Sequence, residues 1–238
     1  MKRPVFKSIF KKELTLYFFG TGFFLVSLIF SIGLFVLFRF TYPVDSLSIE
    51  VAISSLWAVH LISSLFTLLA SQEWEWERNA LRAIKISGVE GHVVFLGKAI
   101  SSWFCLVLLL MFEIVAWIIF FAYSHLTSLD PAQGFFSAKV GMFMAKLFAS
   151  GVIASAGISF LGQLASILAL HSRFRHVLLF IVFFPLSLPA IIAGSSYSRF
   201  AYQAAEWTSA SGMISLQMAY AFVFLSAGVL LYEFLWEE

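Results

Sequence analysis

Long runs of apolar residues separated by short polar stretches dominate the pattern along the chain. A hydrocarbon layer about 30 Å thick requires roughly 20 apolar residues in an α-helix. Six runs of that length are present: residues 14–38, 51–70, 99–123, 147–170, 177–198 and 213–232. The pattern predicts an all-α polytopic membrane protein, in which residues 1–238 form one domain of six transmembrane helices.

The residues before the first run predict a short amphipathic helix. Within residues 4–17, apolar side chains and one acid recur at helical spacing beside lysines, as in a helix that lies in the membrane interface: Phe6, Ile9, Phe10, Glu13, Lys7, Lys11 and Lys12. The alternative is a positively charged flank that only sets orientation. The first run is too long for a secretory signal and no cleavage site follows it, so we expect a retained span.

Composition supports the membrane assignment and excludes several other classes. Hydrophobic residues make up 61% of the chain and charged residues 12%, against roughly 25% charged residues in soluble domains. Basic residues cluster only at the amino terminus, which gives no reason to expect nucleic acid. The single cysteine, Cys105, permits no intrachain disulfide and is expected to pack as a small buried hydrophobe.

The distribution of lysine and arginine predicts the orientation, because basic residues near span ends stay in the cytoplasm. Eleven of them lie in the amino terminus and in the loops after the second and fourth runs, and three lie on the opposite side. We therefore expect a multi-pass membrane protein with both termini in the cytoplasm.

Three features inside the runs are candidates for function. Glu113 is an intramembrane carboxylate, costly enough to suggest a functional site; the alternatives are a protonated packing group or a partner for Lys146. Pro185 and Pro189 are predicted to kink the fifth span, with hydroxyls such as Ser187 compensating, and a kinked span should face protein or a cavity. The fourth run carries a stripe of small residues that predicts a packing face: Ser155, Ser159, Gly162, Ser166 and Ala169.

The one sizeable polar loop, residues 71–98, predicts a site where a separate ATPase docks. Its first half is typical of a short amphipathic helix with early acids, and Ser87 and Gly88 are a stop signal. A phosphate-binding loop requires Gly, four residues, then Gly-Lys-Ser/Thr, whereas five residues separate Gly91 from Gly97 and Ala99 follows Lys98. The chain is therefore not expected to be an enzyme. The predicted coupling residues are Glu73, Glu75, Glu77, Arg78, Leu81, Arg82 and Lys98.

Four stretches resemble the cytochrome c maturation protein B (CcmB, haem exporter protein B) family of ABC transporter permease subunits. They are residues 75–84 with 95–98, Arg173-Phe-Arg175-His176-Val-Leu-Leu, Phe184-Pro185-Leu-Ser-Leu-Pro189, and Leu231-Tyr232-Glu233-Phe234 followed by Glu237-Glu238. The sequence departs from the family pattern at Asn79, Arg82, Gly88 and His176.

The resemblance implies a permease that couples a partner's ATP hydrolysis to haem delivery or to release of a haem-loaded chaperone. It implies a cytoplasmic ATPase dimer, a haem-handling membrane subunit and a second copy of this chain as partners. Haem is then a handled ligand rather than a bound cofactor, because each of the five histidines is isolated in the sequence, and no catalytic or metal site is indicated. The alternatives are a permease for a drug, lipid or polysaccharide, and a scaffold that transports nothing.

Overall fold

The computed structural model describes residues 3–20, 22–42, 48–77, 84, 86, 88–169, 174–203 and 207–237, and these form helices and no strand. Six of the described helices are long and apolar enough to cross a membrane, which confirms the predicted fold class. They are α2 (Phe23–Thr41), α3 (Ile49–Glu77), α5 (Gly91–Trp117), α7 (Ala138–Ala169), α8 (Arg175–Tyr202) and α9 (Trp207–Glu237).

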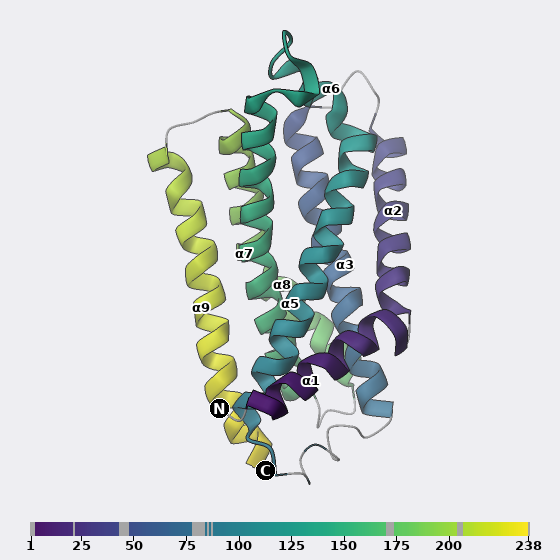
Figure 1. The fold of residues 1–238 in the computed structure, drawn as a ribbon, viewed down its shortest axis with the longest axis vertical. Coiled ribbons are helices and arrows are strands. Elements are labelled where there is room, and N and C mark those ends of the chain that lie inside the picture. Colours follow the sequence, from purple (N-terminus) through teal and green to yellow (C-terminus); the bar gives the residue numbers. More distant parts are fainter. Residues whose placement is uncertain are drawn as a thin grey trace.

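The six helices stand side by side, and both chain ends lie at the same end of the bundle (Figure 1). Helix α7 packs against α5, α8 and α9, and α3 packs against α2, α5 and α8. Helices α2 and α9 occupy opposite edges (Figure 1), and they are the least buried of the six spans. At the far end, α5 continues through the π-helix η3 (Ile118–Ala122) into α6 (Tyr123–Ser128), and the 3-10 helix η4 (Gly134–Phe136) leads into α7.

The first apolar run is not one helix, which corrects the predicted boundary at residue 14. Helix α1 (Arg3–Thr15) and the π-helix η1 (Leu16–Gly20) precede Gly22, whose φ of 65° lies in the left-handed region, and α2 starts only at Phe23. Glycine adopts that conformation at no steric cost, so the chain turns there. Helix α1 crosses the bundle obliquely (Figure 1), and its Ile9 packs against Val93, Val94 and Phe95 of α5. Its apolar side therefore packs against the protein, and its place in the membrane interface stays a prediction.

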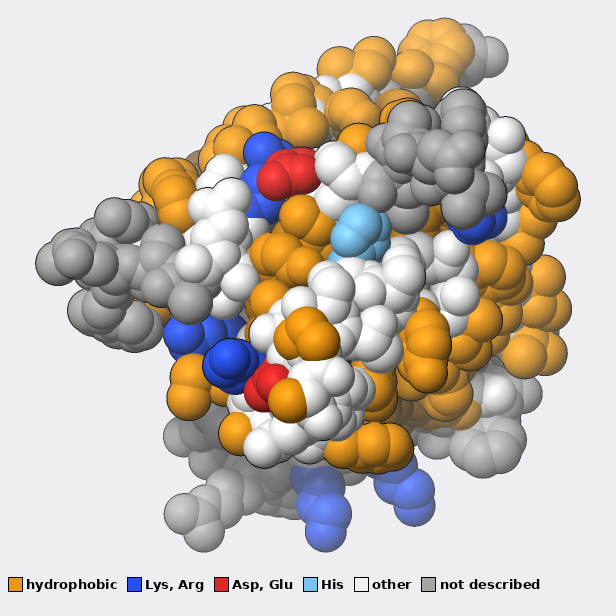
Figure 2. All heavy atoms as spheres, turned by 90° about the horizontal axis from the view of Figure 1, so that it is seen from above, with side chains coloured by type: hydrophobic (Ala, Val, Ile, Leu, Met, Phe, Trp, Pro, Cys, Tyr) orange, Lys and Arg blue, Asp and Glu red, His pale blue; other side chains and the backbone are white. Residues whose placement is uncertain are grey.

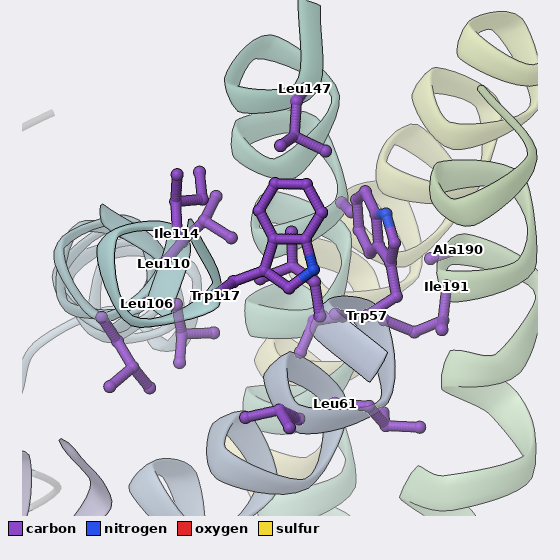
Figure 3. Packing of buried hydrophobic residues seen from close by; sticks show 14 of the residues in the cluster. Trp57, Leu61, Leu106, Leu110, Ile114, Trp117, Leu147, Ala190 and Ile191 are labelled. Atoms are coloured by element: carbon purple, nitrogen blue, oxygen red, sulfur yellow. The ribbon is translucent and has the colours of Figure 1, made fainter. Parts of the chain in front are cut away.

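Two tryptophans fix the centre of the bundle. Trp57 of α3 lies beside Ala190 and Ile191 of α8, and Trp117 of α5 lies next to it (Figure 3). The Trp57 Nε1 donates to Ser198 Oγ of α8 at 3.0 Å, and the Trp117 Nε1 donates to the Ala52 carbonyl of α3. Each indole thus contributes apolar area and one interhelical hydrogen bond, so α3 is tied to both neighbours.

The end of the bundle that carries α6 and η4 shows few charged side chains, and acidic and basic groups lie close together on it (Figure 2). Apolar side chains surround this face at the rim (Figure 2). Such a surface offers no extended patch of one charge among the described residues.

Candidate functional site

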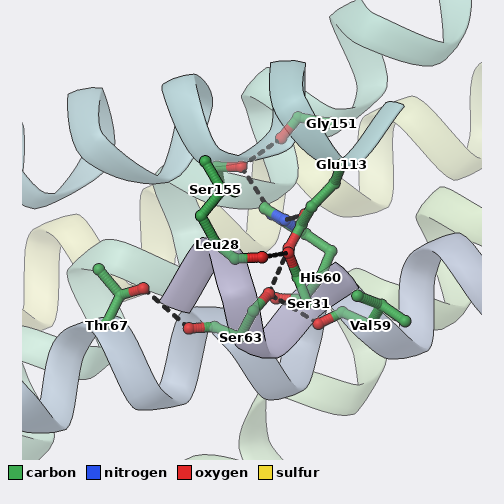
Figure 4. Close-up of polar contacts among 9 residues, drawn as sticks. All are labelled: Leu28, Ser31, Val59, His60, Ser63, Thr67, Glu113, Gly151 and Ser155. Atoms are coloured by element: carbon green, nitrogen blue, oxygen red, sulfur yellow. Dashed lines mark hydrogen bonds and ion pairs between the residues drawn. The ribbon is translucent and has the colours of Figure 1, made fainter. Parts of the chain in front are cut away.

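A buried pair of ionisable side chains joins α3 to α5. The His60 Nδ1 lies 2.7 Å from Glu113 Oε2, and both side chains are fully buried. Figure 4 shows them pointing toward one another between their helices, with Ser155 of α7 on the other side of the imidazole. Burying one of these groups alone would be costly, so each offsets the cost of burying the other.

Hydroxyl groups complete the hydrogen bonding of the pair. Ser155 Oγ lies 3.0 Å from His60 Nε2 and also reaches the Gly151 carbonyl at 2.7 Å. Ser63 donates either to Glu113 Oε1 or to the Val59 carbonyl at 2.7 Å. Every nitrogen and oxygen of the imidazole and the carboxyl therefore has a partner, and each flanking serine has two acceptors for its one proton.

The order Ser155, His60, Glu113 is that of a nucleophile, a base and an orienting acid. A nucleophile also requires room for a substrate carbonyl, and these three side chains are at most 1% exposed. Grooves lined by described residues run between α2 and α3 and between α3 and α8, and neither contains any of the three. The arrangement is therefore suited to sharing a proton rather than to attacking a substrate.

Glu113 was a candidate on its sequence alone, but its partner was not predicted. The alternative pairing with Lys146 is wrong, because Glu113 is hydrogen-bonded to His60 and Ser63, on α3. One signal was present: polar residues recur along the second run at His60, Ser63 and Thr67, a helical spacing that indicates a polar face. An intramembrane carboxylate and a polar helix face together favour a contact between the two.

A second polar layer lies closer to the end that carries the termini. Ser102 of α5 and Ser159 of α7 are 2.6 Å apart, and the Gln163 amide donates to Ser102 at 3.3 Å. The Gln72 amide of α3 donates to the Gly162 carbonyl at 3.2 Å. A side chain at Gly162 would come within 2.6 Å of Leu68 Cδ1, so glycine allows α3 and α7 to approach here.

The predicted small-residue stripe of α7 is this face. Its members are all buried: Ser155, Ser159, Gly162, Ser166 and Ala169. The stripe forms hydrogen bonds as well as close packing.

The predicted coupling residues that the structure describes lie at the end of α3 and near the start of α5. Glu73, Glu75 and Glu77 belong to the last turns of α3, and their side chains are not described. Arg78, Leu81 and Arg82 lie outside the described residues. Lys98 is 3% exposed on α5, inside the bundle rather than on a docking surface. The coupling role of the loop stays a prediction.

A second acid–imidazole pair ties the start of α5 to the last helix. Glu233 of α9 accepts hydrogen bonds from the backbone N–H of His92 at 2.6 Å and lies 2.8 Å from its Nδ1. The His92 Nε2 is 3.4 Å from Glu90. A carboxylate at the first N–H groups of a helix is favourable. The side chains of Glu233 and His92 are 38% and 37% exposed, so this pair is a partly exposed counterpart of the buried one.

Both prolines of the fifth span lie inside one continuous helix, α8, on its exposed side. They remove the donors for the carbonyls of Ile181 and Pro185. Ser187 does not compensate for this, because its hydroxyl donates to the Phe184 carbonyl at 2.9 Å. The exposed side of α8 faces lipid or another subunit rather than the interior of this chain.

Six membrane-length helices with a buried acid–imidazole pair define a polytopic helical membrane protein. The family model described as CcmB protein matches residues 4–230, so the chain belongs to the CcmB family. The family is a membrane component of the haem exporter for cytochrome c maturation. Membership confirms the resemblance and implies ABC transporter partners in general. No curated protein matches the chain.

Proposed function

We propose that this chain is the permease subunit of an ABC transporter complex and couples ATP hydrolysis in a separate subunit to haem delivery or to release of a haem-loaded chaperone. Membership of the CcmB family across residues 4–230 is the observation that carries this proposal. The chain has no phosphate-binding loop of its own. A cytoplasmic ATPase dimer, a haem-handling membrane subunit and a second copy of this chain complete the complex.

The connection between α3 and α5 is the proposed contact with the ATPase. Helix α3 extends to Glu77, beyond its apolar window, which ends at Leu69. At about 1.5 Å per residue the extension carries Glu77, the last of the acids, roughly 12 Å past that window. A force applied to this connection acts on α3 and α5 together, and these are the helices that the buried pair joins.

The proposed orientation places both termini and this connection in the cytoplasm of a bacterial cell, with the protein in the inner membrane. The support is the asymmetry of eleven basic residues against three. Both termini and the start of α5 lie at the same end of the bundle (Figure 1). If the termini are cytoplasmic, the start of α5 is therefore on the cytoplasmic side too.

One observation favours the alternative that this chain transmits motion and transports nothing through its own interior. Three grooves lined by described residues, about 270, 310 and 280 Å³ in volume, lie at the surface between α2 and α3, between α3 and α8, and between α2 and the segment that joins α5 to α6. Side chains fill the junction of α3, α5 and α7. Under this alternative, a haem route through the complex runs between subunits.

Charge reversal tests the proposed contact. Glu75→Lys with Glu77→Lys should weaken co-purification of the ATPase by about tenfold, which corresponds to ~1.4 kcal/mol of binding free energy. Glu50→Lys is the matched control, because Glu50 is exposed at the opposite end of the same helix. Unchanged co-purification and unchanged ATPase stimulation in the double variant would remove the loop from the coupling role.

A further inference from the structure

The His60–Glu113 pair can gain or lose one proton without losing a hydrogen bond. With one proton on the pair, His60 Nδ1–H donates to Glu113 Oε2, Ser155 donates to Nε2, and Ser63 donates to Oε1. This form has a net charge of −1 and leaves no donor or acceptor of the imidazole or carboxyl unpaired.

A second proton has two places to bind. If the proton binds to His60 Nε2, the resulting N–H donates to Ser155 Oγ, and the Ser155 hydroxyl then donates to the Gly151 carbonyl. If the proton binds to Glu113 Oε1, the resulting O–H donates to Ser63 Oγ, and the Ser63 hydroxyl then donates to the Val59 carbonyl. Either form is electrically neutral and fully hydrogen-bonded. Burial disfavours net charge, so the hydroxyls on both sides allow the pair to reach its neutral form.

The two groups have no third charge beside them in the described part of the bundle. Helices α2 and α7 present the hydroxyls of Ser31 and Ser155 near the pair (Figure 4), and α8 contributes Ser198 behind Trp57. The other titratable side chains along α5 toward the termini are Cys105, Lys98 and His92, about two, four and six turns away. Helix α1, which packs against α5, adds the buried Glu13, paired with Lys12 at 2.9 Å. The proton balance is therefore set by His60 and Glu113 themselves.

Unpartnered polar atoms lie between the pair and the end that carries the termini. The hydroxyl of Ser64 and the amide oxygens of Gln72 and Gln163 are buried and have no hydrogen-bond partner among the described residues. Each such group costs about 1–3 kcal/mol unless it is satisfied, and buried water commonly satisfies it. Ser155, Ser159 and Gln163 follow at intervals of four on α7, spanning about 12 Å at ~1.5 Å per residue.

We propose that the His60–Glu113 pair is a proton-binding site inside the membrane, and that Ser64, Gln72, Ser159 and Gln163 hold water that connects it to the end of the bundle carrying the termini. The site goes beyond the proposed transport function and requires neither ATPase nor haem. It makes the contact between α3 and α5 depend on a proton, because removing the second proton leaves a buried net charge at that contact.

Titration of the purified chain in detergent micelles tests the site with protons as the only probe. Infrared spectra should show a carboxylic-acid band that disappears as the pH rises while the chain remains folded, and Glu113→Gln should abolish this band. The nitrogen resonances of His60, assigned by their loss in His60→Gln, should change over the same pH interval. In Glu113→Gln that change should be lost or shifted to another interval.

The partly exposed pair supplies the matched control. Glu233→Gln should leave the His60 titration and the Glu113 band unchanged, because Glu233 pairs with His92 instead. A Glu113 carboxyl that stays ionised while His60 keeps one fixed tautomer at every pH would overturn the proposal. Both outcomes are independent of ATPase binding, so failure here is distinct from failure of the transport function.

Deuterium exchange tests the water connection. On transfer to heavy water the Glu113 band should shift more slowly in Gln163→Leu than in the parent chain, at least tenfold in rate. Leu168→Ala, at an exposed position of the same helix, should leave the rate unchanged. An unchanged rate in Gln163→Leu would overturn access by this route.

Discussion

Removing the buried pair one residue at a time should reveal a larger coupling energy than the same changes reveal in the partly exposed pair. Glu113→Leu leaves the His60 Nδ1 without an acceptor, and His60→Leu leaves the Glu113 Oε2 without a donor. The two serines keep backbone carbonyls as acceptors. Hydrogen bonds to charged groups contribute about 1.5–3 kcal/mol in water-soluble proteins. Between membrane helices the measured values average about 0.6 kcal/mol and reach ~1.7 kcal/mol.

The geometry places this pair at the upper end of the membrane range. The His60–Glu113 contact is 2.7 Å long and both side chains are fully buried, so bulk water does not weaken it. We expect a coupling energy of about 1.5 kcal/mol. Each single variant should lower the free energy of unfolding by roughly 2–3 kcal/mol, because it leaves the other group buried and unpaired.

Reversible unfolding in mixed micelles measures these free energies for the parent chain, the two single variants and the double variant. The same cycle on Glu233 and His92 should give about 0.5 kcal/mol, because those side chains are 38% and 37% exposed. A coupling energy for the buried pair no larger than that of the exposed pair would refute the reasoning.

Two further predictions concern orientation and the fifth span. In a Cys105→Ser background, a cysteine at exposed Ala132 should react with an impermeant thiol reagent in intact cells and one at exposed Ile86 should not; the reverse labelling would invert the orientation. Pro185→Ala with Pro189→Ala should insert normally and impair cytochrome c maturation, because alanine restores two backbone donors and stiffens α8. Full maturation by the double variant would show that the prolines are merely tolerated.

Hydropathy predicted the six spans because it depends on each segment by itself. Hydropathy did not predict the break before α2, because residues 14–38 are apolar on both sides of Gly22 and only the glycine marks the turn. It did not predict the partner of Glu113 either. His60 lies 53 residues away, and whether two helices present their polar faces to each other depends on their rotation within the bundle. The spacing of small residues predicted the packing face of α7, but it did not predict which side chains of α3 and α5 that face would contact.

The wide sequence separation within the buried cluster sets an order of events during synthesis. His60 emerges from the ribosome 53 residues before Glu113 and 95 residues before Ser155, a delay of about 5–20 s for Ser155 at roughly 5–20 residues per second. Helix α3 has the lowest mean hydropathy of the six candidate spans. During that time its imidazole and several of its hydroxyls have no partner from α5 or α7. We expect the insertion machinery to retain α3 in a polar surrounding until both later helices arrive. Helix α3 can therefore complete its polar contacts only after α7, two spans later in the chain, has been made.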